Sequence, residues 1–382
     1  MPASSMNSRE RLRAALNHMT TDRPALDIGG SYATGINTAA YRNLKTHLQL
    51  DTPTELASKR SDIARIDEVI RNRLRIDTYP LLAGAPEGAV LELPDGSYQD
   101  EWRVMRSRAE GGHYYVTQPP LAEADLQDLD RFPWPDPDDP GWSRGLQEEA
   151  IRIRQDSDYA LVLSLPVGFG HQSQFLRGYD QWLVDCALDP AFVGRLMDHV
   201  IEIHMQIAAN MLAELGDLVD VVLYADDMGF QDRPILSPSM FRRLIKPRQK
   251  RFLEHIKART AAKVLYHTCG SIYSLIPDFI EAGVDVLNPV QTTAAHMDPA
   301  QLKREYGRDL AFWGAVDTQR LLPQASPAEV EARVRQLVET LGSDGGYVVS
   351  AANNIQADTP AENILAMATG CQPSERALVP AG

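Results

Sequence analysis

The stretch that decides the fold is residues 262–291, AKVLYHTCGSIYSLIPDFIEAGVDVLNPVQ. Residues 263–266 are apolar and of the types that favour a strand. A helical segment follows, with Pro277 in its first turn and Gly283 at its end, where glycine best tolerates a left-handed backbone. Residues 284–287 then form a second apolar strand. The stretch therefore predicts one β-loop-α-β unit of a parallel sheet.

Polar side chains gather where these two strands end. His267 and Cys269 follow the first strand, and Asn288 and Gln291 follow the second. The crevice at the carboxyl ends of parallel strands is where α/β proteins bind ligands. We therefore expect these four side chains to share one mouth.

The His-x-Cys spacing has two interpretations. An imidazole and a thiolate two positions apart can bind one ion, and zinc favours that pair. A zinc site needs at least three protein ligands, however, and no second cysteine lies near Cys269 in the sequence. The alternative is a buried strand-end histidine beside a small core cysteine. The spacing alone leaves His267 and Cys269 as candidate metal ligands.

Two adjacent carboxylates, Asp226 and Asp227, follow the apolar strand at residues 219–224. Such carboxylates repel each other, so the pKa of one is commonly raised, or one holds a cation or a polar substrate group. Alternatively, one caps the next turn and the other is solvated. We expect at least one of them to take part in catalysis. His171 follows another strand, residues 160–165, and is a candidate ligand-facing residue, although a lone loop histidine is often inert.

The composition excludes several classes of partner. The chain has 382 residues and a formal net charge of −14, which argues against nucleic acid or an anionic membrane surface as its main partner. Its three cysteines are widely separated, as in proteins of a reducing compartment. Neither a signal-peptide core nor a stretch of membrane-span length is found. We expect a cytoplasmic protein that binds neither nucleic acid nor membranes.

Eight apolar strands, most of them followed by a helix, predict a (β/α)8 TIM barrel; the alternative is an open, doubly wound sheet. The strands are residues 23–28, 75–81, 160–165, 219–224, 263–266, 284–287, 310–313 and 346–350. The barrel is expected to form one domain over residues 1–370, with a tail over residues 371–382.

Three further features of this domain are expected. An amphipathic N-terminal helix, residues 8–18, is expected across its base. Asp-Gly and Gly-Gly turns predict an antiparallel β-hairpin insertion at about residues 89–118. Further helices are expected at residues 63–74 and 175–187.

Eight short motifs along the chain together point to one known family. They are residues 176–178, 226–229, 266–270, 283–291, 314–319, 350–356, 358–360 and 363–365. Taken together they resemble the uroporphyrinogen decarboxylase superfamily, over about residues 8–367. True decarboxylases of that superfamily carry an arginine-rich N-terminal stretch that grips the carboxylates of the substrate. The matching segment here, residues 23–30, RPALDIGG, lacks that cluster, which counts against a tetrapyrrole substrate.

The closer resemblance is to the cobalamin-dependent methyltransferase branch. Those enzymes hold zinc with His-x-Cys after strand five and a further cysteine after strand eight. His267 and Cys269 match the first two positions, but Asn353 stands near the third. Because asparagine is a poor zinc ligand, Asp226, Asp227 or a water would have to complete the coordination.

The resemblance implies zinc-assisted transfer of a methyl group between a small O-, N- or S-methyl substrate and a corrinoid or folate acceptor. The corrinoid would be carried on a partner protein, and a homodimer is expected because barrels of the superfamily often form dimers. Asp226 or Asp227 would act as acid or base, and the substrate would be bound by His171, Asn288, Gln291, Asn353 and Gln356. Two alternatives remain: a metal-independent decarboxylase of uroporphyrinogen or a smaller acid, and a non-catalytic binding protein.

Overall fold

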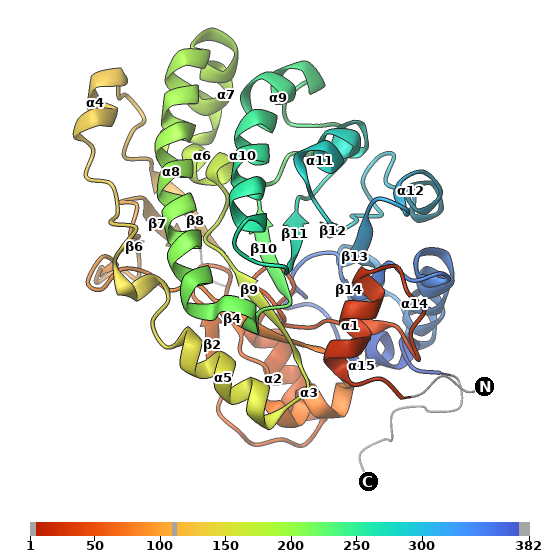
Figure 1. Ribbon diagram of the computed structural model, residues 1–382. Helices are drawn as coiled ribbons and strands as arrows, with labels where there is room; N and C mark the ends of the chain where they lie inside the picture. Colours follow the sequence, from red (N-terminus) through yellow and green to blue (C-terminus); the bar gives the residue numbers. More distant parts are fainter. Residues whose placement is uncertain (1–4, 109–112, 374–382) are drawn as a thin grey trace.

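The structure is a computed structural model that describes residues 5–108 and 113–373 (Figure 1). Eight parallel strands form the barrel wall, hydrogen-bonded in the order β1-β14-β13-β12-β11-β10-β9-β4. Their bounds are β1 Ala25–Leu26, β4 Thr78–Leu82, β9 Ala160–Ser164, β10 Val221–Ala225, β11 Lys263–His267, β12 Val286–Asn288, β13 Ala311–Val316 and β14 Tyr347–Ala351. The fold is the predicted (β/α)8 TIM barrel and not the open sheet.

The seam between β1 and β4 is closed by Asp77. Its backbone N–H donates to the Leu26 carbonyl at 2.8 Å, and its carboxylate accepts the Leu26 N–H at 2.9 Å. The same carboxylate accepts from Arg11 Nη1 at 2.6 Å and from Arg23 Nη1 at 2.8 Å. Asp77 is fully buried. An ionic cluster therefore completes the wall where the strand ladder ends.

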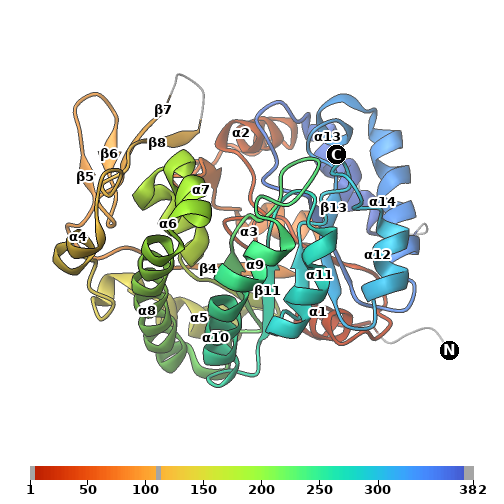
Figure 2. The same ribbon diagram turned by 90° about the horizontal axis from the view of Figure 1, so that it is seen from above.

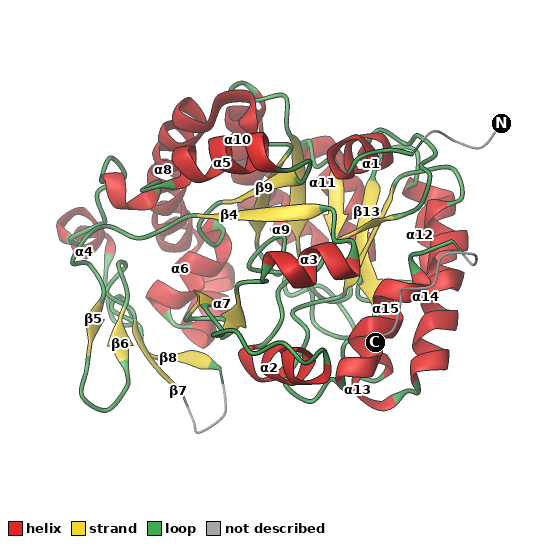
Figure 3. Ribbon diagram, turned by 90° about the horizontal axis from the view of Figure 1, so that it is seen from below, coloured by secondary structure: helices red, strands yellow, loops and turns green. Residues whose placement is uncertain are grey.

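Helices surround the barrel, and α15 packs beside α2 and α3 (Figure 3). The α-helices after α1 are α2 Thr38–His47, α3 Glu68–Leu74, α4 Leu126–Arg131, α5 Leu146–Asp156, α6 Phe169–Arg177, α7 Tyr179–Leu188, α8 Pro190–Leu215, α9 Pro238–Leu244, α10 Lys246–Lys257, α11 Ile276–Ala282, α12 Pro299–Tyr306, α13 Leu321–Gln324, α14 Pro327–Gly342 and α15 Ala361–Gly370. Short 3-10 turns lie at Pro140–Trp142, Gly216–Leu218 and Tyr273–Leu275.

Helix α1, Ser8–Leu16, closes the base of the barrel as predicted. Asn7 caps it, in a capping box with Glu10. Its apolar face, including Leu12 and Leu16, packs with strand residues of the barrel interior such as Val162. The helix thus buries its own stripe and seals the end opposite the mouth.

An antiparallel sheet leaves the barrel between β4 and β9, as predicted for residues 89–118. Its strands are β5 Leu91–Glu92, β6 Tyr98–Gln99, β7 Met105–Arg108 and β8 Tyr114–Gln118. Figure 2 shows this sheet beside α6 and α7, and the Arg106 guanidinium lies 4.6 Å from the centre of the Phe175 ring of α6. The Gly-Gly turn at residues 111–112 lies outside the described residues.

Two predicted helices are corrected. Residues 63–74 do not form one helix, because Ile63–Ala64 is a strand, β3, paired with β2, Leu56–Ser58, and the helix α3 begins only at Glu68. The Ala64 N–H donates to the Ile36 carbonyl at 2.9 Å instead of to a helical turn. Apolar spacing alone could not reveal this bond, because both arrangements bury Ile63.

The predicted helix over residues 175–187 is two helices. Gly178, with φ +85°, separates α6 from α7, and a side chain there would be strained and close to the Pro119 ring. Helix α6 also begins earlier than expected, at Phe169, so His171 lies in a first helical turn and not in a loop.

The C-terminal boundary of the fold lies beyond Gly370. Cys371 and Gln372 are buried, whereas residues 374–382 of the predicted tail lie outside the described residues. Among the helices that the structure describes, none combines the length and apolar character needed to cross a membrane.

Candidate metal centre at the barrel mouth

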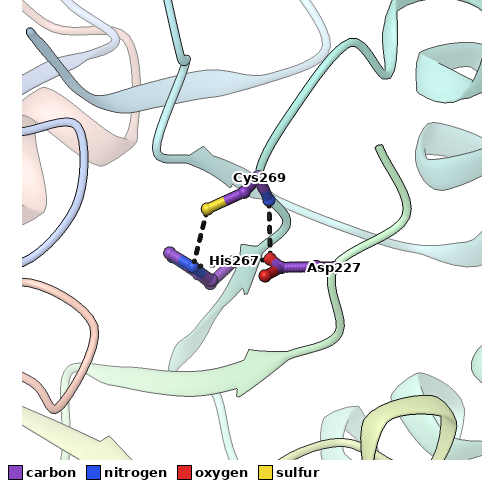
Figure 4. A group of neighbouring side chains, drawn as sticks. All are labelled: Asp227, His267 and Cys269. Carbon is purple, nitrogen blue, oxygen red and sulfur yellow. Dashed lines mark hydrogen bonds and ion pairs between the residues drawn. The ribbon is translucent and has the colours of Figure 1, made fainter. Parts of the chain in front are cut away.

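Three possible metal ligands converge at the carboxyl ends of β10 and β11. Asp227 follows β10, His267 is the last residue of β11, and Cys269 lies two residues beyond it. The ligand atoms of these three residues all lie within 4.8 Å of one another (Figure 4). His267 Nε2 is 3.4 Å from Cys269 Sγ and 3.7 Å from Asp227 Oδ1. Tetrahedral zinc with bonds of about 2.0–2.3 Å separates its ligand atoms by about 3.3–3.8 Å. The donor set and its spacing therefore fit zinc with three protein ligands and one open position.

Asn288 fixes the orientation of His267. The Asn288 amide nitrogen donates to the Trp313 carbonyl at 3.0 Å, so its oxygen faces His267 Nδ1 at 2.5 Å. Nδ1 must then carry the proton, and the lone pair of Nε2 faces Cys269 and Asp227. Because Asn288 is fully buried and uses both ends of its amide, the structure places it behind the histidine.

Cys269 lies between Asp227 and Asn353. Its N–H donates to Asp227 Oδ1 at 2.7 Å, and Asn353 Nδ2 donates to its sulfur at 3.4 Å. Burial, together with the nearby charge of Asp227, raises the pKa of the Cys269 thiol well above its usual value. A bound cation would oppose both effects and favour the thiolate.

Asn353 does not offer an oxygen to the site. Its Oδ1 accepts the Asn354 N–H at 2.7 Å, which leaves the amide N–H groups facing the sulfur of Cys269. Asp227 is therefore the residue placed to serve as the third ligand in this chain.

The two adjacent aspartates have different surroundings. Burial would raise the pKa of Asp227, but the neighbouring imidazoles of His171 and His267 and the Cys269 N–H favour the carboxylate and outweigh burial, so the pKa is lowered. Asp226 points the other way and is fully buried. Its carboxylate accepts the N–H groups of Gly170 at 3.1 Å and His171 at 2.6 Å, and the Tyr224 hydroxyl.

Asp226 thus binds the first turn of α6, and burial raises its pKa despite these hydrogen bonds. A Cβ on Gly168 would lie 2.4 Å from the Asp226 carboxylate, so the backbone can approach this closely only at glycine. The structure therefore separates the pair into one carboxylate that supports a helix and one that faces the mouth.

The other predicted site residues lie around the same mouth. Gln291 braces the loop after β11, because its Oε1 accepts the Gly270 N–H at 2.9 Å and its Nε2 donates to Gln231 at 2.9 Å. His171 Nε2 lies 3.9 Å from Asp227 Oδ2. Gln356 Oε1 lies 3.2 Å from His113 Nε2 and so links the loop after β14 to the antiparallel sheet.

The sequence of this chain matches a known protein family. The uroporphyrinogen decarboxylase (URO-D) family profile matches residues 169–372, which is more than half of the chain. The chain belongs to the uroporphyrinogen decarboxylase family. The matched region contains Asp227, His267, Cys269 and Asn353, so the resemblance read from the motifs is confirmed.

Two relatives of this URO-D family protein are from Methanosarcina mazei. The methylated-thiol–coenzyme M methyltransferase of that organism is 23% identical over 138 residues, which is 36% of this chain and 34% of the relative. The match thus spans about a third of the length of that curated protein. A solved structure of a methyltransferase from the same organism superposes with a TM-score of 0.68 at 17% identity, over 96% of this chain and 98% of the other. This likeness agrees with the barrel fold.

The mouth of this URO-D family protein opens into a cavity of about 700 Å³. Its wall includes His171, Asn353 and Gln356, which were predicted, and Arg60 and Arg106, which were not. These arginines lie before β3 and within β7, so no strand-end position marked them in the sequence. The turn between β2 and β3 brings Arg60 to the mouth, and the packing of the antiparallel sheet on α6 brings Arg106 there.

Proposed function

We propose that this family member is a methyltransferase that binds zinc through Asp227, His267 and Cys269. The observation that carries the proposal is the convergence of these three donors on one point, with the lone pair of His267 turned toward it by Asn288. The names of both Methanosarcina relatives support methyl transfer. The absence of an arginine cluster at residues 23–30 favours it over uroporphyrinogen decarboxylation.

The residues of the site have separate roles in this proposal. Bound zinc supplies a Lewis acid for the heteroatom that carries the methyl group, or for a thiol acceptor. Asn288 holds the Nδ1 proton of His267, and the Asn353 N–H donates to the sulfur of Cys269, so that a thiolate is stabilised there. Asp226 supports the α6 turn that carries His171, so it positions the site and does not act as its acid or base.

The substrate is proposed to lie in the mouth cavity, in contact with His171, Asn353 and Gln356, with Gln291 holding the neighbouring loop. The substrate class is a small O-, N- or S-methyl compound. The methyl acceptor is a corrinoid carried on a partner protein, which approaches over the open mouth. Folate is the alternative acceptor.

Metal content tests the first half of the proposal. Mass spectrometry of the native protein is expected to find about one zinc per chain, as for a single three-ligand site, and to find it lost in Cys269→Ala. Cys371→Ala is the control, because Cys371 is a free cysteine like Cys269 but is buried at the C-terminal end of the fold. Equal zinc in both variants, or none in the wild type, would contradict the metal site.

Methyl transfer tests the second half. Zinc-loaded protein is expected to move a methyl group from a thioether or methyl ether to free cob(I)alamin, and the Cys269→Ala protein is not. Carbon dioxide released from a candidate acid by metal-free protein would support the decarboxylase alternative. Tight binding of small molecules without turnover would support a binding protein.

A further inference from the structure

A second cavity, of about 310 Å³, lies between the barrel and the antiparallel sheet. Arg60, Ser61 and Arg106 line both this cavity and the larger one at the mouth. The two spaces therefore share one wall. We call the smaller space the arginine cavity.

Several residues that line the arginine cavity carry buried polar atoms without a partner among the described residues. Four of its lining residues carry a buried side-chain atom with no hydrogen-bond partner among the described residues: Tyr32 Oη, Arg106 Nη2, Ser164 Oγ and Gln172 Nε2. Arg106, Ser164 and Gln172 are each at most 2% exposed. A buried polar group without a partner is costly, so such a cluster indicates a site built for a polar ligand group.

The cations of this wall are incompletely balanced. Arg106 pairs with Asp100 through Nε at 2.7 Å, which leaves Nη2 free. Among the described residues Arg60 forms no ion pair, and its guanidinium lies 5.2 Å from the centre of the Phe175 ring, the same ring that Arg106 covers. Glu101 also lines the cavity, and burial together with the charge of Asp100 raises its pKa to about 7. Two guanidinium groups thus lie beside Asp100 and a glutamate that is only partly ionised near neutral pH.

Apart from Ser58, Ser61 and Lys59, which pairs with Glu92, the rest of the lining is apolar and includes Tyr98, Trp102, Trp142, Leu165 and Val167. Such walls favour the apolar body of an organic molecule, while the few polar groups fix its orientation. An inorganic anion alone would leave most of this surface uncovered.

Side-chain contacts connect the arginine cavity to the proposed metal centre. The Phe175 ring, which packs against both arginines, also stacks on the His171 ring with centroids 5.5 Å apart and an interplanar angle of 9°. His171 Nε2 in turn lies 3.9 Å from Asp227. A ligand bound by Arg60 and Arg106 would therefore lie on the same side of the mouth as His171 and Asp227.

We propose that the arginine cavity binds the carboxylate of a small organic acid with an apolar body, through Arg60, Arg106 Nη2 and the Tyr32 hydroxyl. Resting on the proposed function, the substrate is then a methylated organic acid whose methyl-bearing end points into the mouth. Charge-assisted hydrogen bonds to two guanidinium groups provide the selectivity for the acid over its neutral analogues.

Calorimetry with two matched pairs tests this inference: benzoate against benzamide, and phenylacetate against phenylacetamide. Each acid is expected to bind at least about tenfold more tightly than its amide, as one charge-assisted hydrogen bond can provide. Arg60→Gln is expected to weaken acid binding about tenfold or more and to leave amide binding unchanged. Arg233→Gln, which removes an exposed arginine of the loop after β10, is the control and is expected to bind as the wild type does.

Tyr32→Phe provides a second test, because it removes only one hydroxyl, and it is expected to weaken binding of the acids more than that of the amides. Equal affinity for acids and amides, no binding of either, or acid binding unaffected by Arg60→Gln would overturn the inference. Binding is measured without turnover and also on zinc-free protein. Acid binding without any methyl transfer would therefore reject the proposed function alone, and methyl transfer without acid selectivity would reject the arginine cavity alone.

Discussion

At the scale of single residues, Asp226 and Asp227 differ in what their carboxylates contact. Asp226 accepts two N–H groups of α6 and the Tyr224 hydroxyl, whereas Asp227 shares the mouth with His267 and Cys269. Asp227→Asn is therefore expected to weaken zinc binding by more than the about 10–100-fold typical of an outer-shell partner. Asp226→Asn is expected to keep zinc and to lose about 1–3 kcal/mol of unfolding free energy.

These two variants are controls for each other, since each removes one charge at neighbouring positions. Zinc affinity is measured by competition with a chelator, and stability by urea unfolding of the zinc-free protein. The assignment fails if Asp226→Asn releases zinc while Asp227→Asn retains it.

Residue types and strand ends were enough to predict that His267, Cys269 and one of the paired aspartates meet at the carboxyl ends of their strands. They could not decide between Asp226 and Asp227, because that choice depends on where α6 begins. Nor could they show that Asn288 lies behind His267, since a strand-end amide can equally face a ligand. No sequence pattern marked Arg60 or Arg106, because they reach the mouth through the turn between β2 and β3 and through the packing of the antiparallel sheet on α6.

At the scale of elements, the antiparallel sheet carries a titratable group that links its stability to pH. Glu101 lies between β6 and β7, beside Asp100, Arg60 and Arg106, and its pKa is raised from 4.5 to about 7 by burial and by the charge of Asp100. The folded protein therefore keeps this proton at pH values where the unfolded chain has released it. The free energy of unfolding is expected to fall as the pH rises from about 4.5 to about 7 and to be unaffected by this group above that range.

Glu101→Gln is expected to remove this pH dependence and to stabilise the protein by about 1–3 kcal/mol above pH 7, since one pKa unit corresponds to about 1.4 kcal/mol. Urea unfolding over the same pH range measures the effect. Glu123→Gln removes an exposed glutamate of a nearby loop and controls for the loss of charge. A pH profile of Glu101→Gln parallel to that of the wild type would show that Glu101 is not the group responsible.

The boundaries of the helices and strands show what the periodicity of apolar residues can and cannot predict. The spacing of Ile63, Ile66 and Ile70 fits one face of a helix, and all three are buried, yet Ile63 lies in a strand. The periodicity therefore predicted burial correctly and the backbone incorrectly. Local capping defines a boundary more sharply, since Ser326 and Glu329 form a capping box and α14 begins directly after Ser326.

At the scale of the whole molecule, the eight strands could be counted from the sequence, but the way they close could not. The first strand, β1, has only two residues, and Asp77 takes over at the seam by binding Leu26, Arg11 and Arg23. These partners are 51 to 66 residues away in the chain, so no local pattern connects them.

Asp77→Ala is expected to destabilise the protein by about 3–5 kcal/mol, because among the described residues it leaves the largely buried Arg23 guanidinium without a carboxylate and Arg11 with Asp22 alone. Glu254→Ala removes the exposed partner of Lys250 and is expected to change stability by less than about 0.5 kcal/mol. Urea unfolding of both variants measures the difference. The seam lies at the amino end of the strands, opposite the mouth, so Asp77→Ala is expected to bind zinc as the wild type does while it remains folded. Loss of zinc from the folded variant would show that the closure of the barrel and the geometry of the mouth are coupled.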